Sequence, residues 1–392
     1  MKKIIKSLPF KLVIALLAGI GAGLIANEPV MQVVVTLQKL AGAVIMFSIP
    51  LIIIGFIAPS ITKLGGNASK LLGIALAIAY VSSIGAAFFS TGAGYAIIPH
   101  LHVASSAEGI RELPKVIFDL QIPQIMPVMS ALVFSVFTGL AAVWNKSQRI
   151  IGALDEFQEI VISIVQKIII PVLPFFIAFT FCSLTYEGGV TRQLPLFLAV
   201  ILLVLTGHFI WIALLYGLAG IYSGKNPFRV LRHYAPAYLT AVGTMSSAAT
   251  LPVALSSARK SDALRPGMVS FGIPLFANIH LCGSVLTETF FVMVVSLALY
   301  GALPPLGTMI LFCLLLGVFA IGAPGVPGGT VMASLGLITG ILGFDSTGTA
   351  LMLTIFALQD SFGTACNVTT DGALTLILTG YVEKQEKNSK KK

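Results

Sequence analysis

Eight long apolar segments, and two more that are interrupted by Gly, Pro and Ser, limit what this chain can fold into. Eight stretches are long enough to cross about 30 Å of hydrocarbon as helices: 12–26, 38–60, 71–99, 124–144, 158–184, 195–221, 266–300 and 347–381. Only 10% of the residues are charged, whereas soluble domains carry about 25%. The sequence therefore predicts an all-α polytopic membrane protein with eight transmembrane helices.

The two broken segments, 232–258 and 304–342, are apolar but contain the runs 245-MSSAATLPVALSSARK-260 and 322-GAPGVPGGTVMAS-334. Irregular backbone persists at membrane depth only where it lines a cavity or packs in protein. Each broken segment precedes a helix that carries polar side chains. A broken segment followed by a polar helix, occurring twice with entry from opposite sides of the membrane, is typical of an inverted-repeat transporter. The alternative is that both are Gly-Pro loops between ordinary spans.

The distribution of Lys and Arg predicts the topology. With a cytoplasmic N-terminus and eight spans, 19 of the 24 basic residues lie inside and four lie outside (Lys39, Arg111, Lys115 and Arg192). Both termini are then cytoplasmic, and the tail 383–392 is expected to be disordered. The net charge of +9 follows from this topology and suits anionic lipid, so nucleic acid is not an expected partner.

One polar stripe lies in the last apolar stretch. Asp360, Thr364, Asn367 and Asp371 follow the spacing i, i+4, i+7, i+11 and share one helix face. A carboxylate at membrane depth costs about 2.5–3.5 kcal/mol even on the lenient insertion scale. Two of them on one face therefore predict a site for a small polar ligand.

A second polar group lies in 273-IPLFANIHLCGSVLTETFF-291. On a continuous helix, His280 and Glu288 share nearly one face, and both can take up a proton between about pH 5 and 8 after ordinary shifts from burial. They are candidates for proton coupling. The alternative is that His280 is a packing residue and that Glu288 pairs with Lys167. His208 and Lys167 otherwise have no motif around them and are expected to be structural.

These motifs resemble the dicarboxylate/amino acid:cation symporters of the glutamate transporter superfamily. The run 246-SSAATLPV-253 resembles the family's SSSGTLPV, 325-GVPGG-329 resembles GVPGAG, and 367-NVTTD-371 resembles NVTGD. The resemblance implies two re-entrant hairpins, a homotrimer and elevator-type transport. It also implies scaffold helices in 1–70, a transport-domain helix in 71–100, three further helices in 101–226 and a transport core in 227–382.

The resemblance also assigns site residues, position by position. Asp360 matches the aspartate that holds the substrate's amino group, while Thr364 and Asn367 match residues that touch the amino acid backbone. The hairpin positions expected to bind substrate are Ser246, Ser247, Val326, Pro327 and Gly328. The expected cation ligands are Asn278, Asn367 and Asp371, with Asp371 as the carboxylate ligand of a sodium ion.

Departures from the family pattern change the expected chemistry. Gly363 stands where acidic-substrate members carry an Arg, so a side-chain carboxylate would lack its forked partner, and a neutral amino acid is favoured. The glycine is expected to leave an open, uncharged gap beside the substrate. His280, Cys282 and Ser284 replace the Asn, Asp and Thr of the family's NMDGT motif. A thiol is a poor ligand for a hard cation, which indicates that one sodium site is lost.

The function expected is amino acid symport coupled to Na⁺, H⁺ or both, without an enzyme cofactor. A sodium-coupled dicarboxylate symporter is the alternative within this class, and a ligand sensor or anion channel is the alternative outside it. An intramembrane enzyme would need a nucleophile–base pair or a metal cluster, and no such spacing occurs beyond His280 and Cys282. The four cysteines show no C-x-x-C spacing that would predict a disulfide framework or a zinc site.

Overall fold

The computed structural model describes residues 8–65, 70–101, 113–120, 122–323, 325 and 327–389, and this part of the chain is helical without strands. Its longer helices are α2 (Leu8–Ile25), α3 (Glu28–Gly65), α4 (Lys70–Ile97), α5 (Val128–Trp144), α6 (Gln148–Ile164), α7 (Ile170–Tyr186), α8 (Gly189–Ser223), α10 (Ala235–Thr244), α11 (Ser247–Arg259), α12 (Pro266–Ile279), α13 (Cys282–Tyr300), α14 (Leu306–Gly322), α15 (Gly329–Gly340) and α16 (Ser346–Ser389). The short elements are η1 (Ile98–His100), the π-turn η2 (Val165–Ile169) and α9 (Phe228–Leu231).

Four helical segments of the described chain are long and apolar enough to cross a membrane: Leu71–His100, Gln148–Ser183, Ala199–Ser223 and Pro266–Tyr300. Four shorter apolar helices accompany them, at Ile14–Ile25, Val133–Trp144, Leu306–Gly322 and Gly329–Gly340. These helices make the chain a multi-pass membrane protein. The number of eight spans stays a prediction.

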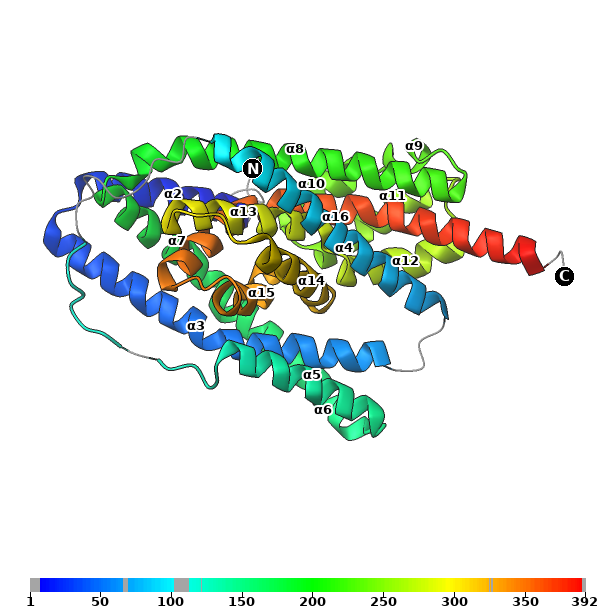
Figure 1. Ribbon diagram of the computed structural model, residues 1–392, viewed down its shortest axis with the longest axis horizontal. Helices are drawn as coiled ribbons and strands as arrows, with labels where there is room; N and C mark the ends of the chain where they lie inside the picture. The colour runs from blue at the N-terminus through cyan, green and yellow to red at the C-terminus, as the bar shows by residue number, and fades with distance from the viewer. Residues whose placement is uncertain are drawn as a thin grey trace.

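The helices pack in two groups (Figure 1). The first, which we call the outer group, comprises α2, α3, α5, α6 and α7, and the second, the core group, comprises α4, α8 and α10–α16. In Figure 1, α8 runs along one long edge of the molecule and α3 with α5 and α6 along the other, with α13–α16 between them. In an 18-residue apolar stretch of the Pro266–Tyr300 segment, 94% of the residues are buried inside the protein, and nearly all residues of α13 are buried, so α13 lies at the centre of the core group.

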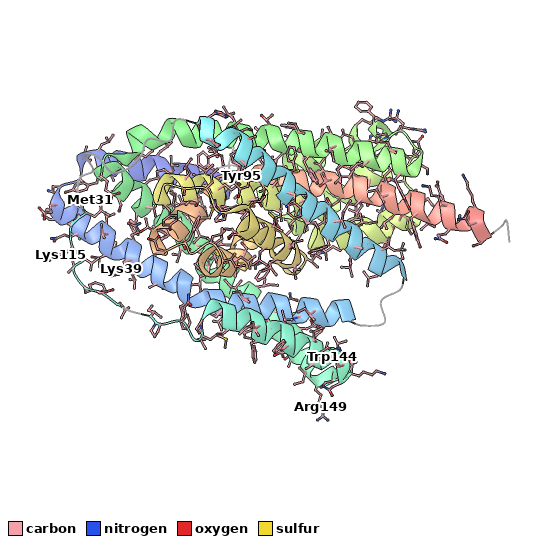
Figure 2. All side chains as sticks on the ribbon, viewed as in Figure 1. Met31, Lys39, Tyr95, Lys115, Trp144 and Arg149 are labelled. Atoms are coloured by element: carbon pink, nitrogen blue, oxygen red, sulfur yellow. The ribbon has the colours of Figure 1, made fainter. Side chains whose placement is uncertain are left out.

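The connection from η1 to α5 returns along the outer group. Lys39 of α3 pairs with Asp119 at 2.9 Å, and the backbone N–H of Ile117 donates to the Thr36 hydroxyl at 2.9 Å. Figure 2 shows Lys39 and Lys115 on neighbouring strips of chain at this edge, and Trp144 and Arg149 at the far turn between α5 and α6. The polar stretch 100–115 is predicted from the sequence to be an external loop, and residues 102–112 of it lie outside the described residues.

Both broken segments fold as helix–turn–helix hairpins. The first, α10–α11, turns at Met245, whose φ of 53° lies in the left-handed region. The second, α14–α15, ends its turn at Gly328 with φ 70°, a conformation that favours glycine. Val326, predicted to bind substrate, lies outside the described residues. Re-entry of the hairpins into the membrane stays a prediction.

The predicted continuous helix 266–300 is wrong, because α12 ends at Ile279 and α13 begins at Cys282. His280 is extended, with φ −123° and ψ 100°, and Leu281 is also non-helical. His280 and Glu288 therefore do not share one helix face. The freed N–H groups at the start of α13 are bound by a side chain of α16, a contact between distant segments that periodicity cannot reveal.

The expected disorder of the tail is also wrong as far as residue 389, because α16 continues to Ser389. Ion pairs hold this extension against the loops beside it. Glu383 contacts Lys225 at 2.6 Å, and Glu386 contacts Arg265 at 2.7 Å. Residues 390–392 lie outside the described residues.

The crossing of α2 and α7 makes a matched pair of glycine substitutions informative. A Cβ on Gly19 would overlap the backbone of Ala178, whereas a Cβ on Gly21 would meet nothing within 4 Å. We expect Gly19→Ala to destabilise the protein by about 1–3 kcal/mol through overpacking. Gly21→Ala should be neutral or stabilising by up to about 1 kcal/mol through helix propensity. Thermal unfolding of the detergent-purified variants measures both, and equal melting temperatures would contradict the close crossing.

Candidate functional site

The tip of the second hairpin covers Asp360. One carboxylate oxygen of Asp360 accepts a hydrogen bond from the backbone N–H of Gly328 at 2.6 Å, and the side chain is only 3% exposed. Gly328 immediately precedes α15, and the N-terminus of a helix favours a negative charge. Two other residues predicted to bind substrate lie nearby. Pro327 is next to Gly328 in the tip, and Thr364 lies one turn after Asp360 on α16. The Asp360 carboxyl is therefore held by the tip of the second hairpin.

The two hairpin tips contact each other. The Ser246 hydroxyl donates to the Gly325 carbonyl at 2.6 Å and also accepts the N–H of Ala249 at 3.2 Å. A Cβ on Gly325 would lie 3.1 Å from the Ala277 carbonyl of α12 and 3.3 Å from the Ser247 Cβ. Glycine thus permits a three-way contact among both tips and the end of α12. The predicted hairpin residues Ser246 and Ser247 lie in this closed contact.

Asn367 is fully engaged with α13. Its side-chain oxygen accepts the backbone N–H groups of Gly283 at 2.7 Å and Ser284 at 3.2 Å, while its nitrogen donates to the Ser284 hydroxyl at 2.9 Å. These are orphan donors of the first turn of a helix. Asn367, predicted to bind substrate or cation, stabilises the break between α12 and α13 in this structure.

Gly363 lies at the crossing of α13 and α16. A Cβ there would lie 3.3 Å from the backbone N, the Cα and the hydroxyl of Ser284. The gap that the sequence predicts beside the substrate is therefore closed by α13 in this conformation. A larger side chain at this position would have to displace Ser284.

His280 joins three elements in the core. Its Nδ1 lies 3.0 Å from a carboxylate oxygen of Asp371, and its Nε2 lies 2.9 Å from the Ser82 hydroxyl of α4. The side chains of His280 and Asp371 are 0% and 1% exposed. The second Asp371 oxygen has no hydrogen-bond partner among the described residues. Neither Ser82 nor the contact between His280 and Asp371 could be predicted from the sequence, in which two serines within an apolar stretch, Ser82 and Ser83, are the only signal of a polar contact.

Glu288 contacts the second hairpin instead of Lys167. One carboxylate oxygen accepts a hydrogen bond from the Ser334 hydroxyl of α15, and the other has no partner among the described residues. Lys167 is exposed on η2, in a surface groove that Glu156 and Glu159 also line. The alternative pairing of Glu288 with Lys167 is therefore wrong.

Two more polar residues support the break in 266–300. His208 Nε2 of α8 lies 3.1 Å from the Gly283 carbonyl and 2.9 Å from the Thr287 hydroxyl. Cys282 Sγ lies 3.2 Å from the Thr370 hydroxyl of α16. These contacts give His208 a structural place in the core.

The side chains predicted to bind a cation do not assemble a sodium site. Asn278 is exposed, and its side-chain nitrogen donates to the Pro274 carbonyl at 2.8 Å. The Asn367 oxygen already accepts two N–H groups, and Asp371 contacts an imidazole. Among the described residues, no group of three His, Cys, Asp or Glu side chains is placed to hold a metal ion. The donor set therefore does not fit a sodium ion bound by these side chains.

Comparison with known proteins finds membrane transporters that are similar in sequence. The chain is 29% identical over 266 residues to excitatory amino acid transporter 3 of Mus musculus, and 30% identical over 266 residues to that of Homo sapiens. Both matches cover 66% of this chain and 49% of the relative, so the chain spans about half the length of these relatives. It is also 33% identical over 184 residues to the serine/threonine transporter SstT of Acinetobacter baumannii, covering 45% of each.

A family profile gives the wider assignment. Residues 8–381 match the profile of the sodium:dicarboxylate symporter family. This match extends over nearly all of the described helices, from α2 to the polar stripe of α16. The chain therefore belongs to the sodium:dicarboxylate symporter family, whose members are membrane transporters and not enzymes.

Proposed function

We propose that the chain is a secondary active symporter that carries a neutral amino acid across the cell membrane with Na⁺, H⁺ or both. The observation that carries this proposal is the Asp360 carboxylate, which is buried at 3% exposure, accepts the backbone N–H of Gly328 at the hairpin tip and is hydrogen-bonded to the Thr364 side chain on its own helix. When the hairpin opens, this anion loses its N–H partner. The ammonium of an amino acid then supplies the charge that a buried carboxylate requires.

The packing of two helix groups supports an elevator mechanism within a homotrimer. The core group, with both hairpins and α16, would move as the transport domain, and the outer group would be the scaffold at the trimer contacts. Both termini would be cytoplasmic, as the Lys and Arg distribution indicates. The contact of Ser246 with Gly325 would then be the closed state of the substrate site.

The neutral substrate rests on the absence of a fixed cation in the sequence around the site. There is no Arg or Lys between residues 346 and 381 or between 322 and 345, and Gly363 stands at the position of the family's Arg. A second carboxylate on the substrate would be buried without a partner. A substrate with a small polar side chain, as the name of the serine/threonine transporter relative suggests, needs no such cation.

Sodium would find its ligands in backbone oxygens. The break after Ile279 leaves the last carbonyls of α12 without the partners that a continuing helix would supply. Carbonyl oxygens suit a hard cation, and broken helices supply such ligands in transporters. A sodium-coupled dicarboxylate symporter remains the second candidate, because the family is named for such substrates.

The role of Asp360 is tested by removing its charge. We expect Asp360→Asn to lower amino acid uptake by about 100-fold or more, because breaking a buried charge pair costs about 2–5 kcal/mol. Uptake of labelled substrate into proteoliposomes measures the effect. Asp262→Asn is the matched control, since Asp262 is exposed and pairs with Arg229 at the surface. Full uptake by Asp360→Asn would exclude the ammonium contact.

Charge selectivity separates the two candidate functions. In counterflow with a panel of labelled amino acids and dicarboxylates, neutral amino acids should exchange at least about 100-fold better than aspartate, glutamate or succinate, since an unpaired buried charge is strongly rejected. Concentration of substrate against its gradient also separates a symporter from a channel or sensor. Submillimolar binding of succinate would favour the dicarboxylate alternative.

Proton coupling is assigned to Glu288. Its carboxyl joins α13 to Ser334 of the second hairpin and has a free second oxygen, so its protonation changes a contact of the gate. We expect an inward proton gradient to stimulate uptake and Glu288→Gln to remove this stimulation. Glu187→Gln, on a half-buried residue at the end of α7, is the control. Uptake that follows sodium alone in both variants would contradict proton coupling.

A further inference from the structure

A buried imidazole contacts Asp371, the carboxylate that the sequence predicts to bind a coupling cation. The imidazole of His280 lies between the Asp371 carboxylate and the Ser82 hydroxyl, with contacts of 3.0 Å and 2.9 Å. Each ring nitrogen thus has an oxygen partner, one from α16 and one from α4. The ring therefore connects two core helices across the break between α12 and α13.

The charge of Asp371 requires such a partner. Its side chain is 1% exposed, and a buried carboxylate without a counter-charge is strongly destabilising. Among the described residues, the basic side chain that contacts it is His280. The other titratable groups that face this region are Cys282, Cys366, Tyr216 and Tyr234, none of which supplies a positive charge.

The neighbouring side chains argue against a sodium ion in the same space. Cys282 presents sulfur, which is a poor ligand for a hard cation, and it contacts the Thr370 hydroxyl. The Asn367 oxygen is occupied by two backbone N–H groups. Among the buried members of the predicted ligand set, Asn367 and Asp371, one oxygen of Asp371 lacks a partner among the described residues, and one oxygen does not make a sodium site.

We infer that the His280 imidazolium is a built-in counter-cation that replaces one coupling sodium ion, so that Asp371 binds no sodium during the cycle. The inference deepens the proposed symport and rests on it. It also explains together the departures from the family's NMDGT motif at positions 280 and 282. The side chain at 280 brings its own charge, and a thiol suffices at 282 because no ion has to be coordinated there.

Sodium-dependent thermal unfolding tests the inference without transport. The purified full-length protein is melted in NaCl and in choline chloride at equal ionic strength. The sodium-induced rise in melting temperature should be the same in the native protein and in Asp371→Asn, because any sodium bound by backbone carbonyls is unaffected. A rise in the native protein that Asp371→Asn abolishes would show that Asp371 binds sodium, and would overturn the inference.

Removal of the imidazole provides the complementary measurement. His280→Ala leaves a space beside the Asp371 carboxylate and the Ser82 hydroxyl, so sodium should raise its melting temperature by several degrees more than it does for the native protein. His280→Ala/Asp371→Asn should lose this extra rise. An equal rise in His280→Ala and the native protein would contradict the replacement of a cation.

A double-mutant cycle covers the case in which His280→Ala does not fold. His280→Gln keeps bulk and polarity but leaves the carboxylate unpaired, so its melting temperature should fall, and Asp371→Asn added to it should restore part of the loss. Additive losses would exclude the ion pair. Failure of all proteoliposome uptake with these thermal results intact would remove the symport function while leaving the counter-cation in place.

Discussion

The contact of Asn367 with the start of α13 organises the rest of the core. A helix interrupted inside a membrane protein exposes backbone donors that lipid cannot satisfy. One side-chain oxygen of Asn367 accepts two of them, and His208 Nε2 lies within hydrogen-bonding distance of the Gly283 carbonyl. Because the break is stabilised in this way, His280 leaves the helix and turns its ring between α4 and α16. The same break frees carbonyl oxygens at the end of α12 beneath the hairpin tips.

The hairpin tips depend on this frame. Gly325 packs against the Ala277 carbonyl at the end of α12 and accepts the Ser246 hydroxyl. Gly328 in turn presents its N–H to Asp360. The hairpin tips are therefore held through backbone groups and one serine, with no ion pair among their described residues. Such contacts have modest net free energies of about 0.5–1.5 kcal/mol each, which suits a gate that opens in every cycle.

Much of the core could be predicted from local sequence, and its departures from prediction share a cause. The Gly-Pro runs predict the two hairpins, and the spacing of Asp360 and Asp371 predicts a polar stripe on one helix, because both signals lie within a few residues. The break at His280 was missed because its support comes from Asn367, far away in the chain. The helical tail was missed because Lys225 and Arg265, on other loops, pair with its glutamates. Gly363 was interpreted as an open gap, whereas its role in this conformation is close approach to Ser284.

The three buried carboxylates differ in what balances them, and this difference separates their tasks. Asp371 has a side-chain cation within its own core group, so its charge is matched whether or not the gate is closed. Asp360 contacts a backbone N–H of the second hairpin and the neutral Thr364 side chain, so under the proposed function opening of that hairpin leaves its charge without a counter-charge. Glu288 has a neutral hydroxyl on the same hairpin, which is compatible with a protonated carboxyl. The desolvation cost of a buried carboxylate would thus be met in three ways: by an ion pair at Asp371, by the bound substrate at Asp360 and by a proton at Glu288. Only the last two carboxylates contact described residues of the second hairpin, and we therefore propose that coupling between ligand and gate resides in Asp360 and Glu288.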